Sequence, residues 1–174
     1  MVLQSQRLYY RELLPTDDEV MFALDSDPEV HRYLGNNPLT NIEQSREYIK
    51  NIRQQYQDNG IGRMAVFIKE TNEFIGWAGL KLEHNVNGYA QFYDVGYRFM
   101  KKYWGKGYAT ESALFFISYG FNELRVEKIN ACAMVDHIAS RRALEKSGLK
   151  FVEDFDYGDG EICAWYEIEK PQKV

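Results

Sequence analysis

Three strand-like runs follow one another between residues 62 and 100, with only short turns between them, and this feature constrains the fold most. The runs are "GRMAVFIKE" (62–70), "FIGWAGLKLE" (74–83) and "YAQFYDVGYRFM" (89–100). A turn at Thr71-Asn72 separates the first two runs, and "HNVNG" separates the second from the third. Connections this short join antiparallel neighbours in a sheet. We therefore predict an antiparallel meander in the middle of the chain.

Before the meander, the sequence predicts one strand and two helices. The strand is "RLYYREL" (7–13), and Thr16 or Asp17 can cap the helix that follows it. A second, amphipathic helix covers residues 41–57 and ends at Asp58-Asn59-Gly60. These elements place two helices between the first strand and the meander.

After the meander, helices and strands alternate. A helix begins after Gly107, and an apolar strand covers residues 126–135. The helical spacing of Leu114, Ile117, Phe121 and Leu124 predicts the buried stripe of that helix. A further helix at about 137–147 has Asp136 as its expected N-cap and Gly148 just after its end. Strands 150–157 and 161–170 close the chain as a hairpin around Gly158-Asp159-Gly160.

The resulting order is β, α, α, β, β, β, α, β, α, β, β, and it predicts an α+β layered domain with a mixed sheet. About seven strands and four helices are expected from this order. The chain has 174 residues, which is enough for one sizeable core. We therefore expect a single domain over residues 1–174.

Composition and charge exclude several functional classes. The formal net charge of −5 disfavours binding to nucleic acid or to an anionic membrane, both of which require a basic face. Cys132 and Cys163 lie in strand-like runs and are expected to be buried, reduced thiols. His31, His84 and His137 are scattered, so no metal site is expected. The first residues show no long apolar run, and we expect a cytoplasmic protein.

A cationic turn with glycines lies between the third meander strand and the next helix. Arg98, Lys101, Lys102 and Lys106 lie within the segment 95–110, which contains no acidic residue. Free N–H groups at a helix start, together with the positive end of the helix dipole, suit a phosphate group. Two glycines in the turn let the backbone approach such an anion closely. The turn is therefore either an anion site or an ordinary loop with solvated lysines.

Two common phosphate-binding motifs fit this turn poorly. The Walker-type pattern G-x-x-x-x-G-K-[ST] is absent. A dinucleotide fingerprint would place a third glycine where this chain has Thr110. Glu127 lies about 20 residues further on, but at the start of a strand, whereas a ribose-binding carboxylate is expected at a strand end. A dinucleotide-binding enzyme therefore remains an alternative of lower rank.

The turn and its flanks resemble a known family. "KYWGKG" (102–107) resembles the Q/R-x-x-G-x-G/A signature of the GNAT superfamily of acetyl-CoA-dependent N-acetyltransferases. The longer string "DVGYRFMKKYWGKGYATES" resembles the RimJ/RimL branch of that superfamily. Five further segments resemble this branch in order and spacing, and they extend the likeness over nearly the whole chain: "RLYYREL", "SDPEVHRYL", "FIGWAGL", "ISYGFNEL" and "ASRRALEKSGLKFVED".

The resemblance implies a three-layer fold and a cofactor position. The central sheet would splay open between its fourth and fifth strands, with coenzyme A in the V-shaped gap. The pyrophosphate would lie on the backbone amides of the turn, and the acyl-pantetheine arm would run along residues 94–100. The cofactor-binding residues that the resemblance implies are Phe99, Met100, Lys102, Tyr103, Trp104, Gly105, Lys106, Gly107, Tyr108, Ala109, Thr110, His137 and Ser140.

The sequence departs from the family pattern at two of these positions. Lys102 stands where the family usually has Gln or Arg, and a lysine keeps the charge but not a fork of donors. The branch typically reads N-x-A-S after the fifth strand, whereas this chain reads His137-Ile138-Ala139-Ser140. An imidazole can donate or accept a hydrogen bond, so His137 is either a cofactor contact or a solvent-facing residue of the first helical turn.

Acetyl transfer to an amine requires a neutral amine, donors for a developing oxyanion and a proton for the leaving thiolate. By family likeness, the backbone N–H of Phe99 is the oxyanion donor. Glu145 occupies the position at which many relatives carry a thiol-protonating Tyr, so Ser140 is the candidate for that role, unless its hydroxyl only binds the helix backbone. Asp94 is the candidate general base, unless it only pairs with a cation, and Glu83 is the reserve.

The resemblance therefore predicts an enzyme that transfers an acetyl group from acetyl-CoA to a primary amine by direct attack in a ternary complex, without a metal. The acceptor would be a protein N-terminal amine or a small-molecule amine, bound near helices 16–57 and the hairpin at 158–160. The family also allows a homodimer. A catalytically inactive CoA-binding module is the main alternative.

Overall fold

The predicted meander forms three adjacent antiparallel strands. In the computed structural model these are β3 (Arg63–Ile68), β4 (Phe74–Val86) and β5 (Tyr89–Phe99). Asn87 and Gly88 close the β4–β5 hairpin with φ angles of 47° and 77°. Positive φ at both central residues is typical of a type I′ turn, whose twist matches that of the flanking strands. Strand β4 therefore continues through "HNV", which the sequence pattern placed in a loop.

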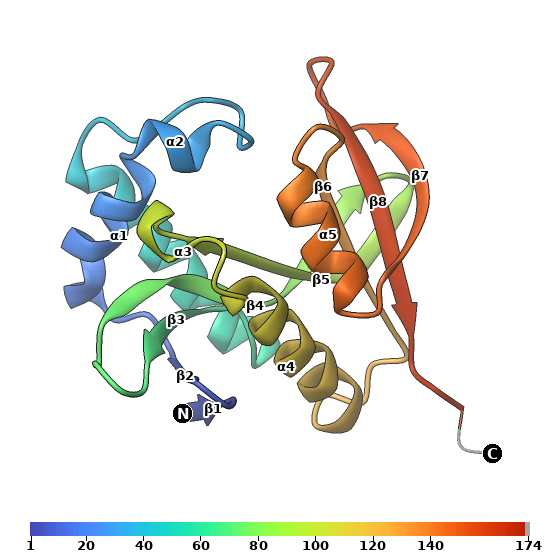
Figure 1. Ribbon diagram of the computed structural model, residues 1–174, viewed down its shortest axis with the longest axis horizontal. Coiled ribbons are helices and arrows are strands. Elements are labelled where there is room, and N and C mark those ends of the chain that lie inside the picture. Colours follow the sequence, from blue (N-terminus) through green and yellow to red (C-terminus); the bar gives the residue numbers. More distant parts are fainter. Residues whose placement is uncertain (173–174) are drawn as a thin grey trace.

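The meander is part of an eight-stranded mixed sheet (Figure 1). The structure describes residues 1–172, and the strand order is β1-β2-β3-β4-β5-β6-β8-β7. The remaining strands are β1 (Val2–Gln4), β2 (Leu8–Arg11), β6 (Lys128–Met134), β7 (Lys150–Asp156) and β8 (Ile162–Glu169). The predicted mixed sheet is confirmed, with β1 as an additional strand. Three residues are too few for an alternating pattern to be recognised in the sequence.

The helices follow the predicted order with one addition. They are α1 (Asp18–Asp25), α2 (Pro28–His31), α3 (Ile42–Asn59), α4 (Tyr108–Asn122) and α5 (Ile138–Lys146), with 3-10 turns η1 (Pro15–Asp17) and η2 (Lys101–Tyr103). The unexpected helix α2 begins at Pro28, and the Asp27 side chain accepts the Glu29 N–H at 2.9 Å. His137, not Asp136, is the N-cap residue of α5, and its side chain makes no capping bond.

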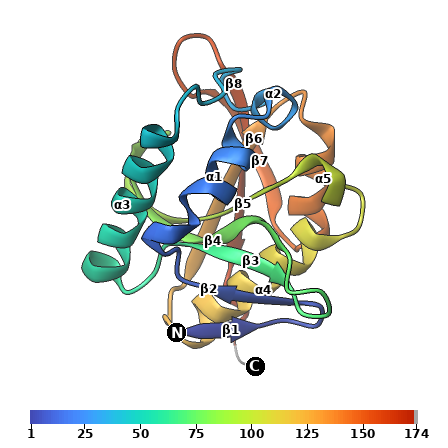
Figure 2. The same cartoon turned by 90° about the vertical axis from the view of Figure 1, so that its left-hand side faces the viewer.

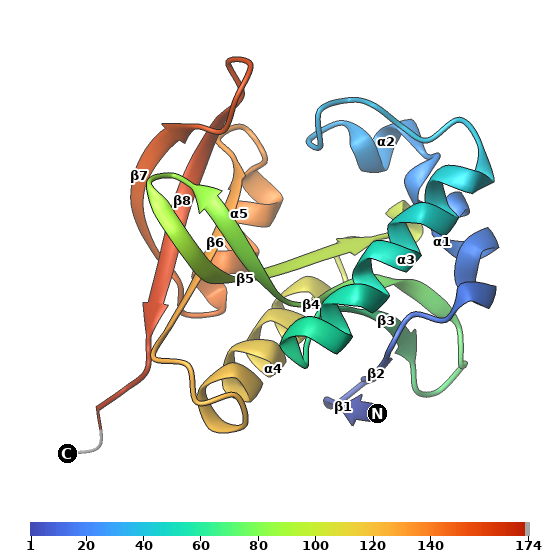
Figure 3. The same cartoon turned by 180° about the vertical axis from the view of Figure 1, so that it is seen from behind.

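The helices cover both faces of the sheet. Views from opposite sides and from the edge show α4 and α5 on one face and α3 on the other (Figures 1, 2 and 3). Strand β3 illustrates the alternation, because Met64 and Val66 belong to the apolar cluster under α4, whereas Ala65 and Phe67 belong to the cluster under α1 and α3. This arrangement confirms the three-layer expectation.

The buried stripe of α4 contains two of the four predicted residues, Ile117 and Phe121. Its buried apolar residues are Ala113, Phe116, Ile117 and Phe121, whereas Leu114 is 48% exposed. The helix is apolar on more than one side, so residue spacing alone did not determine which face meets the sheet.

The sheet opens between β5 and β6, as the resemblance predicted for its fourth and fifth expected strands. These strands are the parallel pair of the sheet, and Asp94 and Asn130 are the one register pair between them. Beyond Asp94, the edge of β5 that faces β6 has no strand partner, although β5 stays paired with β4 up to Phe99. The last residues of β5 therefore form one wall of a V-shaped opening.

Within residues 1–172, no helix combines the length and the apolar character that are needed to cross a bilayer.

Gly76 fixes the geometry of β4 opposite the end of β5. Its φ is 146°, and a Cβ at this position would lie 2.0 Å from the carbonyl oxygen of Arg98 and 2.8 Å from the Cα of Phe99. Only glycine allows the two backbones to approach this closely. The end of β5, where the opening lies, therefore depends on this glycine.

We expect Gly76→Ala to lower the free energy of unfolding by at least about 3 kcal/mol, because a steric clash adds to backbone strain. Urea denaturation measures this loss. Gly88→Ala is the matched control, since Gly88 also has positive φ (77°) but no atom within 4 Å of an added Cβ. The control should lose only about 1 kcal/mol. Equal losses in both variants would contradict a role for the close approach.

Candidate functional site

The glycine turn presents a row of free backbone donors. Gly105 and Gly107 have φ angles of 72° and 82°, and Gly107 is the N-cap residue of α4 without a side-chain cap. Among residues 1–172, no group accepts a hydrogen bond from the backbone N–H groups of residues 105–110. The ammonium groups of Lys102 and Lys106 lie 4.8 Å and 5.7 Å from the centre of the Tyr103 ring. The turn therefore combines free N–H groups, a helix N-terminus and two cations, which is a suitable arrangement for an anion.

An ion pair from the N-terminus braces this turn. Arg7 donates to the Lys106 carbonyl at 2.8 Å and pairs with Glu111 in the first turn of α4 at 2.7 Å. The same carboxylate accepts the Arg7 N–H and the Ser5 hydroxyl, each at 2.7 Å. Burial alone would raise the pKa of Glu111, but the hydrogen bonds from Arg7 and Ser5 lower it overall. Sequence reasoning missed Glu111 and Arg7 because 104 positions separate them.

Phe99 and Met100 lie where β5 enters the turn. Phe99 is buried, and its carbonyl accepts the indole N–H of Trp104 at 2.8 Å. The Met100 N–H donates to the Ile75 carbonyl at 2.9 Å, and the Met100 carbonyl accepts from Tyr103 at 2.9 Å. Met100 therefore has its N–H engaged within the protein, so any further contact would use the second lone pair of its carbonyl.

Ser140 faces a tyrosine of β5 across the opening. The Ser140 hydroxyl lies 3.2 Å from the Tyr97 hydroxyl, which also donates to the Ser140 carbonyl at 3.1 Å. Burial raises the pKa of Tyr97 to about 12, so this phenol stays protonated at neutral pH. The serine is therefore more than a helix-start residue that binds its own backbone, because its hydroxyl is linked to β5. Tyr97 was not a predicted site residue, and its partner lies 43 positions away.

His137 contacts the N-terminal half of the chain. Its ring stacks on Tyr33, which follows α2, with ring centroids 4.1 Å apart and planes 7° apart. Burial lowers the pKa of His137, and Asp136 offsets part of that change. His137 is thus neither a solvated residue nor free to turn, and the stack joins the segment after α2 to the loop before α5.

Asp94 lies on the opposite face of β5 and is paired with Arg63. Its side chain is 13% exposed, and the Arg63 guanidinium binds its carboxylate directly. Arg63 also donates to the Gly79 carbonyl at 2.5 Å and to the Asp94 carbonyl at 2.9 Å. Burial raises the pKa of Asp94, and the charge of Arg63 opposes part of the rise. Asp94 is therefore ion-paired, as the alternative expectation had it, and its side chain also lines a cavity on this face.

Gly96 makes room for this pair. A Cβ on Gly96 would lie 2.8 Å from the nearer guanidinium nitrogen of Arg63. The glycine thus lets the Arg63 side chain reach across β4 to Asp94. This gives a structural reason for the glycine in "DVGYRF".

A second, half-buried cation lies further along β5. Arg98 pairs with Asp25 at 2.6 Å, and the same Asp25 oxygen lies 3.4 Å from His31. The guanidinium groups of Arg63 and Arg98 lie 5.2 Å and 5.0 Å from the centre of the Trp77 ring. Sequence reasoning did not connect these residues, because they come from separate segments of the chain and Arg98 lies 73 positions from Asp25.

A cavity of about 190 Å³ adjoins Asp94 on this face. Its polar wall includes Asp94, Glu83 and both arginines, and Glu83 is itself paired with Lys81. The remaining lining residues are Tyr48, Trp77, Lys81, Val86, Phe92, Cys132 and Tyr157. Helix α3 and the loop between β7 and β8 thus contribute to this cavity through Tyr48 and Tyr157.

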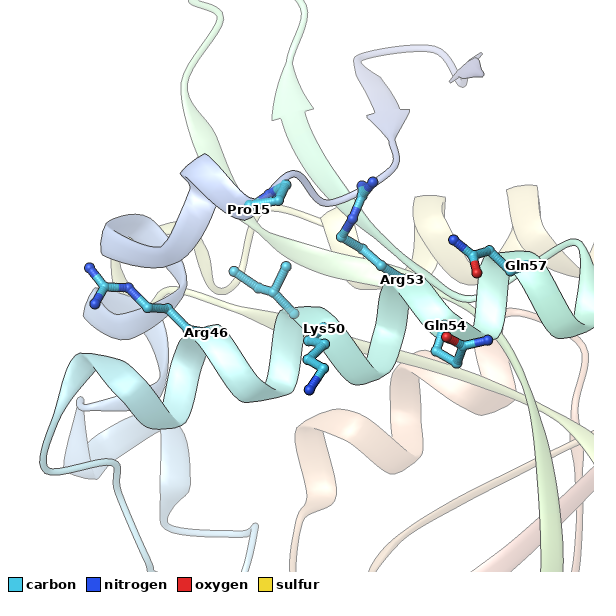
Figure 4. A pocket seen from close by; sticks show the side chains of 7 residues that line it. Pro15, Arg46, Lys50, Arg53, Gln54 and Gln57 are labelled. Atoms are coloured by element: carbon cyan, nitrogen blue, oxygen red, sulfur yellow. The ribbon is translucent and has the colours of Figure 1, made fainter.

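A larger hollow of about 450 Å³ lies on the outer side of α3 (Figure 4). Arg46, Lys50 and Arg53 line it together with Pro15 and three other side chains of α3. Arg46 is paired with Asp18 at 2.7 Å, and Arg53 donates to the Leu13 carbonyl at 2.7 Å. Because these arginines are already engaged and the lining contains no Asp, Glu, His, Cys or Ser, we do not assign catalysis to this hollow.

The two cysteines are free thiols, as expected. Cys163 is buried and Cys132 is half-buried at the wall of the cavity near Asp94. Burial raises the pKa of both thiols, that of Cys163 to about 11. Neither is therefore suited to act as a nucleophile at neutral pH.

Among residues 1–172, no three His, Cys, Asp or Glu side chains gather to form a metal site.

The structure thus brings the predicted site residues to one strand and its surroundings. The turn lies at the end of β5, Ser140 meets Tyr97 on the α5 side, and Asp94 faces the cavity on the α3 side. The chemistry that this arrangement allows is anion binding next to a carboxylate and a pair of hydroxyl groups.

Comparison with known proteins assigns this arrangement to a family. A model of the acetyltransferase (GNAT) domain matches residues 7–150. The chain is 31% identical over 169 residues to p20, an uncharacterized N-acetyltransferase of Bacillus licheniformis. This match covers 94% of the present chain and 92% of p20. It is 32% identical over 177 residues to the uncharacterized N-acetyltransferase YoaA of Bacillus subtilis, with 99% and 98% coverage.

A solved structure shows the same fold. RimL, a ribosomal L7/L12 alpha-N-protein acetyltransferase in complex with coenzyme A, superimposes with a TM-score of 0.80 at 14% identity, over 97% of this chain and 98% of that one. The sheet that opens between β5 and β6, the free amides at the start of α4 and the match over residues 7–150 agree with one another. The chain therefore belongs to the GNAT family and is an acetyl-CoA-dependent N-acetyltransferase.

Proposed function

We propose that residues 1–174 form one domain that transfers the acetyl group of acetyl-CoA to a primary amine by direct attack in a ternary complex. The observation that carries this proposal is the opening beyond the Asp94–Asn130 pair, which has free backbone donors at one end and a carboxylate at its side. The acceptor is a protein N-terminal amine or a small-molecule amine. Thiol release from acetyl-CoA with a panel of such amines tests the proposal, and CoA binding without turnover of any amine would indicate a binding module instead.

The residues of the turn fit the phosphates of coenzyme A. The N–H groups of residues 105–110 are free, and Lys102 and Lys106 lie beside them. We assign pyrophosphate binding to the whole segment from Lys102 to Thr110. The unpaired edge of β5 up to Phe99 would bind the pantetheine arm, with Ser140 and His137 on the far side of the opening.

When bound, acetyl-CoA supplies the acetyl group and a thiolate as the leaving group. The amine nitrogen forms a bond to the acetyl carbon, and the carbon–sulfur bond breaks. Asp94 takes the proton from the amine, directly or through a water molecule, and the Ser140 hydroxyl gives a proton to the thiolate. The N–H of Phe99 is assigned to the charge that develops on the acetyl oxygen.

Arg63 and Tyr97 support these roles without contacting the reacting atoms. Arg63 fixes the Asp94 carboxylate and favours its ionised form. Tyr97 positions Ser140, because its hydroxyl donates to the Ser140 carbonyl at 3.1 Å and lies 3.2 Å from the Ser140 hydroxyl. Solvent returns a proton to Ser140 and takes up the proton that Asp94 accepted, which balances the transfer.

The brace beneath the turn should control CoA affinity. Glu111→Gln removes the charge that holds Arg7, so we expect the Kd for CoA to rise about fivefold, as for the loss of roughly 1 kcal/mol from a partly exposed ion pair. Isothermal titration calorimetry measures the change. Glu47→Gln is the control, since Glu47 pairs with Lys50 on the exposed side of α3. The brace has no functional role if both variants bind CoA as the wild type does.

Ser140→Ala should lower kcat about a hundredfold and leave the KM for acetyl-CoA nearly unchanged, because proton donation to the thiolate is lost while the phosphate contacts remain. Steady-state thiol release measures both constants. Ser147→Ala is the control at the opposite end of α5, since the Ser147 hydroxyl only donates to the Ala143 carbonyl at 2.7 Å. Unchanged turnover of Ser140→Ala would remove this serine from the mechanism.

The pH dependence of kcat/KM should report Asp94. The free amine must be neutral and Asp94 must be ionised, so log kcat/KM should rise with a slope of about one below the amine pKa and about two below the pKa of Asp94. Because burial raises that pKa, the steeper limb should begin above the ordinary range of a carboxyl group.

Asp94→Asn should lower kcat/KM about a hundredfold and leave a slope of about one throughout. Glu83→Gln, at the same cavity, should keep the steeper limb. A wild-type profile without that limb would exclude Asp94 as the base.

A further inference from the structure

The cavity next to Asp94 carries information about the acceptor, given the acetyl transfer proposed above. It lies on the face of β5 that Asp94 and Arg98 share, opposite the face of Tyr97 and Ser140. Its volume of about 190 Å³ is below the range of about 300–1,000 Å³ that is typical of drug-sized ligands. An acceptor that enters it is therefore small, or inserts only one residue.

The charges around the cavity are already paired. Arg63 binds Asp94, Lys81 binds Glu83, and Arg98 binds Asp25. Three cations line the cavity and only two of the three carboxylates do. An acceptor that carries only positive charges would meet these cations without an unpaired carboxylate to compensate, so polyamines and aminoglycosides fit poorly.

Two residues that line the cavity each carry a buried donor without a partner. The Nε–H of Arg98 and the indole N–H of Trp77 have no hydrogen-bond partner among the described residues. The two residues are cross-strand partners, and Trp77 is only 6% exposed. Buried donors without partners cost free energy, and native proteins keep them mainly where a ligand or a water satisfies them.

A carboxylate would use both donors. Its two oxygens can each accept one N–H, and a charged acceptor makes the stronger bonds. The positive charges of Arg98 and Arg63 next to Trp77 favour the same group. An amine on the same small molecule would then lie on the side of Asp94, where the proposed base is.

We propose that the acceptor is a small zwitterionic amine, an amino acid or a close analogue, whose carboxylate binds Arg98 and Trp77 and whose amine faces Asp94. Every charged residue of the lining is already paired, and Tyr48, Val86 and Phe92 add aromatic or apolar side chains, so the side chain of this amino acid is uncharged.

The test is thiol release from acetyl-CoA with matched acceptors. Each uncharged amino acid is assayed beside its amide and its decarboxylated amine, together with spermidine, kanamycin and short peptides with free N-termini. We expect at least one amino acid to exceed its amide and its decarboxylated amine about tenfold or more in kcat/KM. Equal or better turnover of the amides, of spermidine, of kanamycin or of the peptides would overturn the inference and leave acetyl transfer standing.

Two variants locate the preference. Arg98→Lys keeps the charge that faces Asp25 but removes the Nε–H, and Trp77→Phe keeps an aromatic ring but removes the indole N–H. Each should reduce the preference for the amino acid over its amide about tenfold, mainly through KM. Arg46→Lys is the matched control, since Arg46 is another arginine paired with an aspartate, away from this cavity. An unchanged preference in both cavity variants would overturn the assignment, provided that their melting temperatures match the wild type.

Absence of acetyl transfer and a wrong acceptor class give different results in these assays. If no amine releases thiol although CoA binds, acetyl transfer itself is wrong. Calorimetric titration of the CoA-loaded protein with the same amino acids and their amides then decides the question of the cavity. Tighter binding of an amino acid supports the carboxylate site, and equal or absent binding overturns it.

Discussion

The single pairing between Asp94 and Asn130 is the constraint on which the rest of the site depends. At this pair β5 and β6 are joined in one sheet, and beyond it they separate while β5 stays attached to β4. The parallel direction of β6 requires a crossover, which α4 provides. The turn before α4 therefore lies at the end of β5, and its free amides lie at the end of the opening.

Interactions that are distant in sequence hold this opening in shape. Arg7 and Glu111 tie the N-terminus to the start of α4, Arg63 of β3 reaches across β4 to Asp94, and Tyr33 stacks on His137. Each of these contacts joins elements that chain connectivity alone would leave separate. The site is thus built from a few long-range contacts on a sheet whose regular pairing has been interrupted.

The sequence allowed the prediction of those features that depend on neighbouring residues. The hairpins, the helix ends at Gly60 and Gly148 and the order of elements follow from local patterns, and the family motif located the turn. The strand β1 and the helix α2 were missed because each is too short to show a period. Leu114 was placed on the wrong face because α4 is apolar on several sides.

The partners of the site residues could not be predicted in the same way. Asp94 and Ser140 were recognised by their positions, but Arg63 and Tyr97 lie 31 and 43 residues away from them. Such pairs appear only once the register of the strands is known. For the same reason, the unused donors of Trp77 and Arg98 have no signature in the sequence.

The alternation of side chains along β5 has a consequence for the order of events. Asp94 and Arg98 point to one face of this strand, and Tyr97 points to the other. Under the proposed assignment, the cosubstrate lies along the free edge of this strand and beside Tyr97, whereas the amine lies on the face of Asp94. Neither blocks the path of the other, so neither has to bind first, and the acetylated product can depart while the spent thiol is still bound.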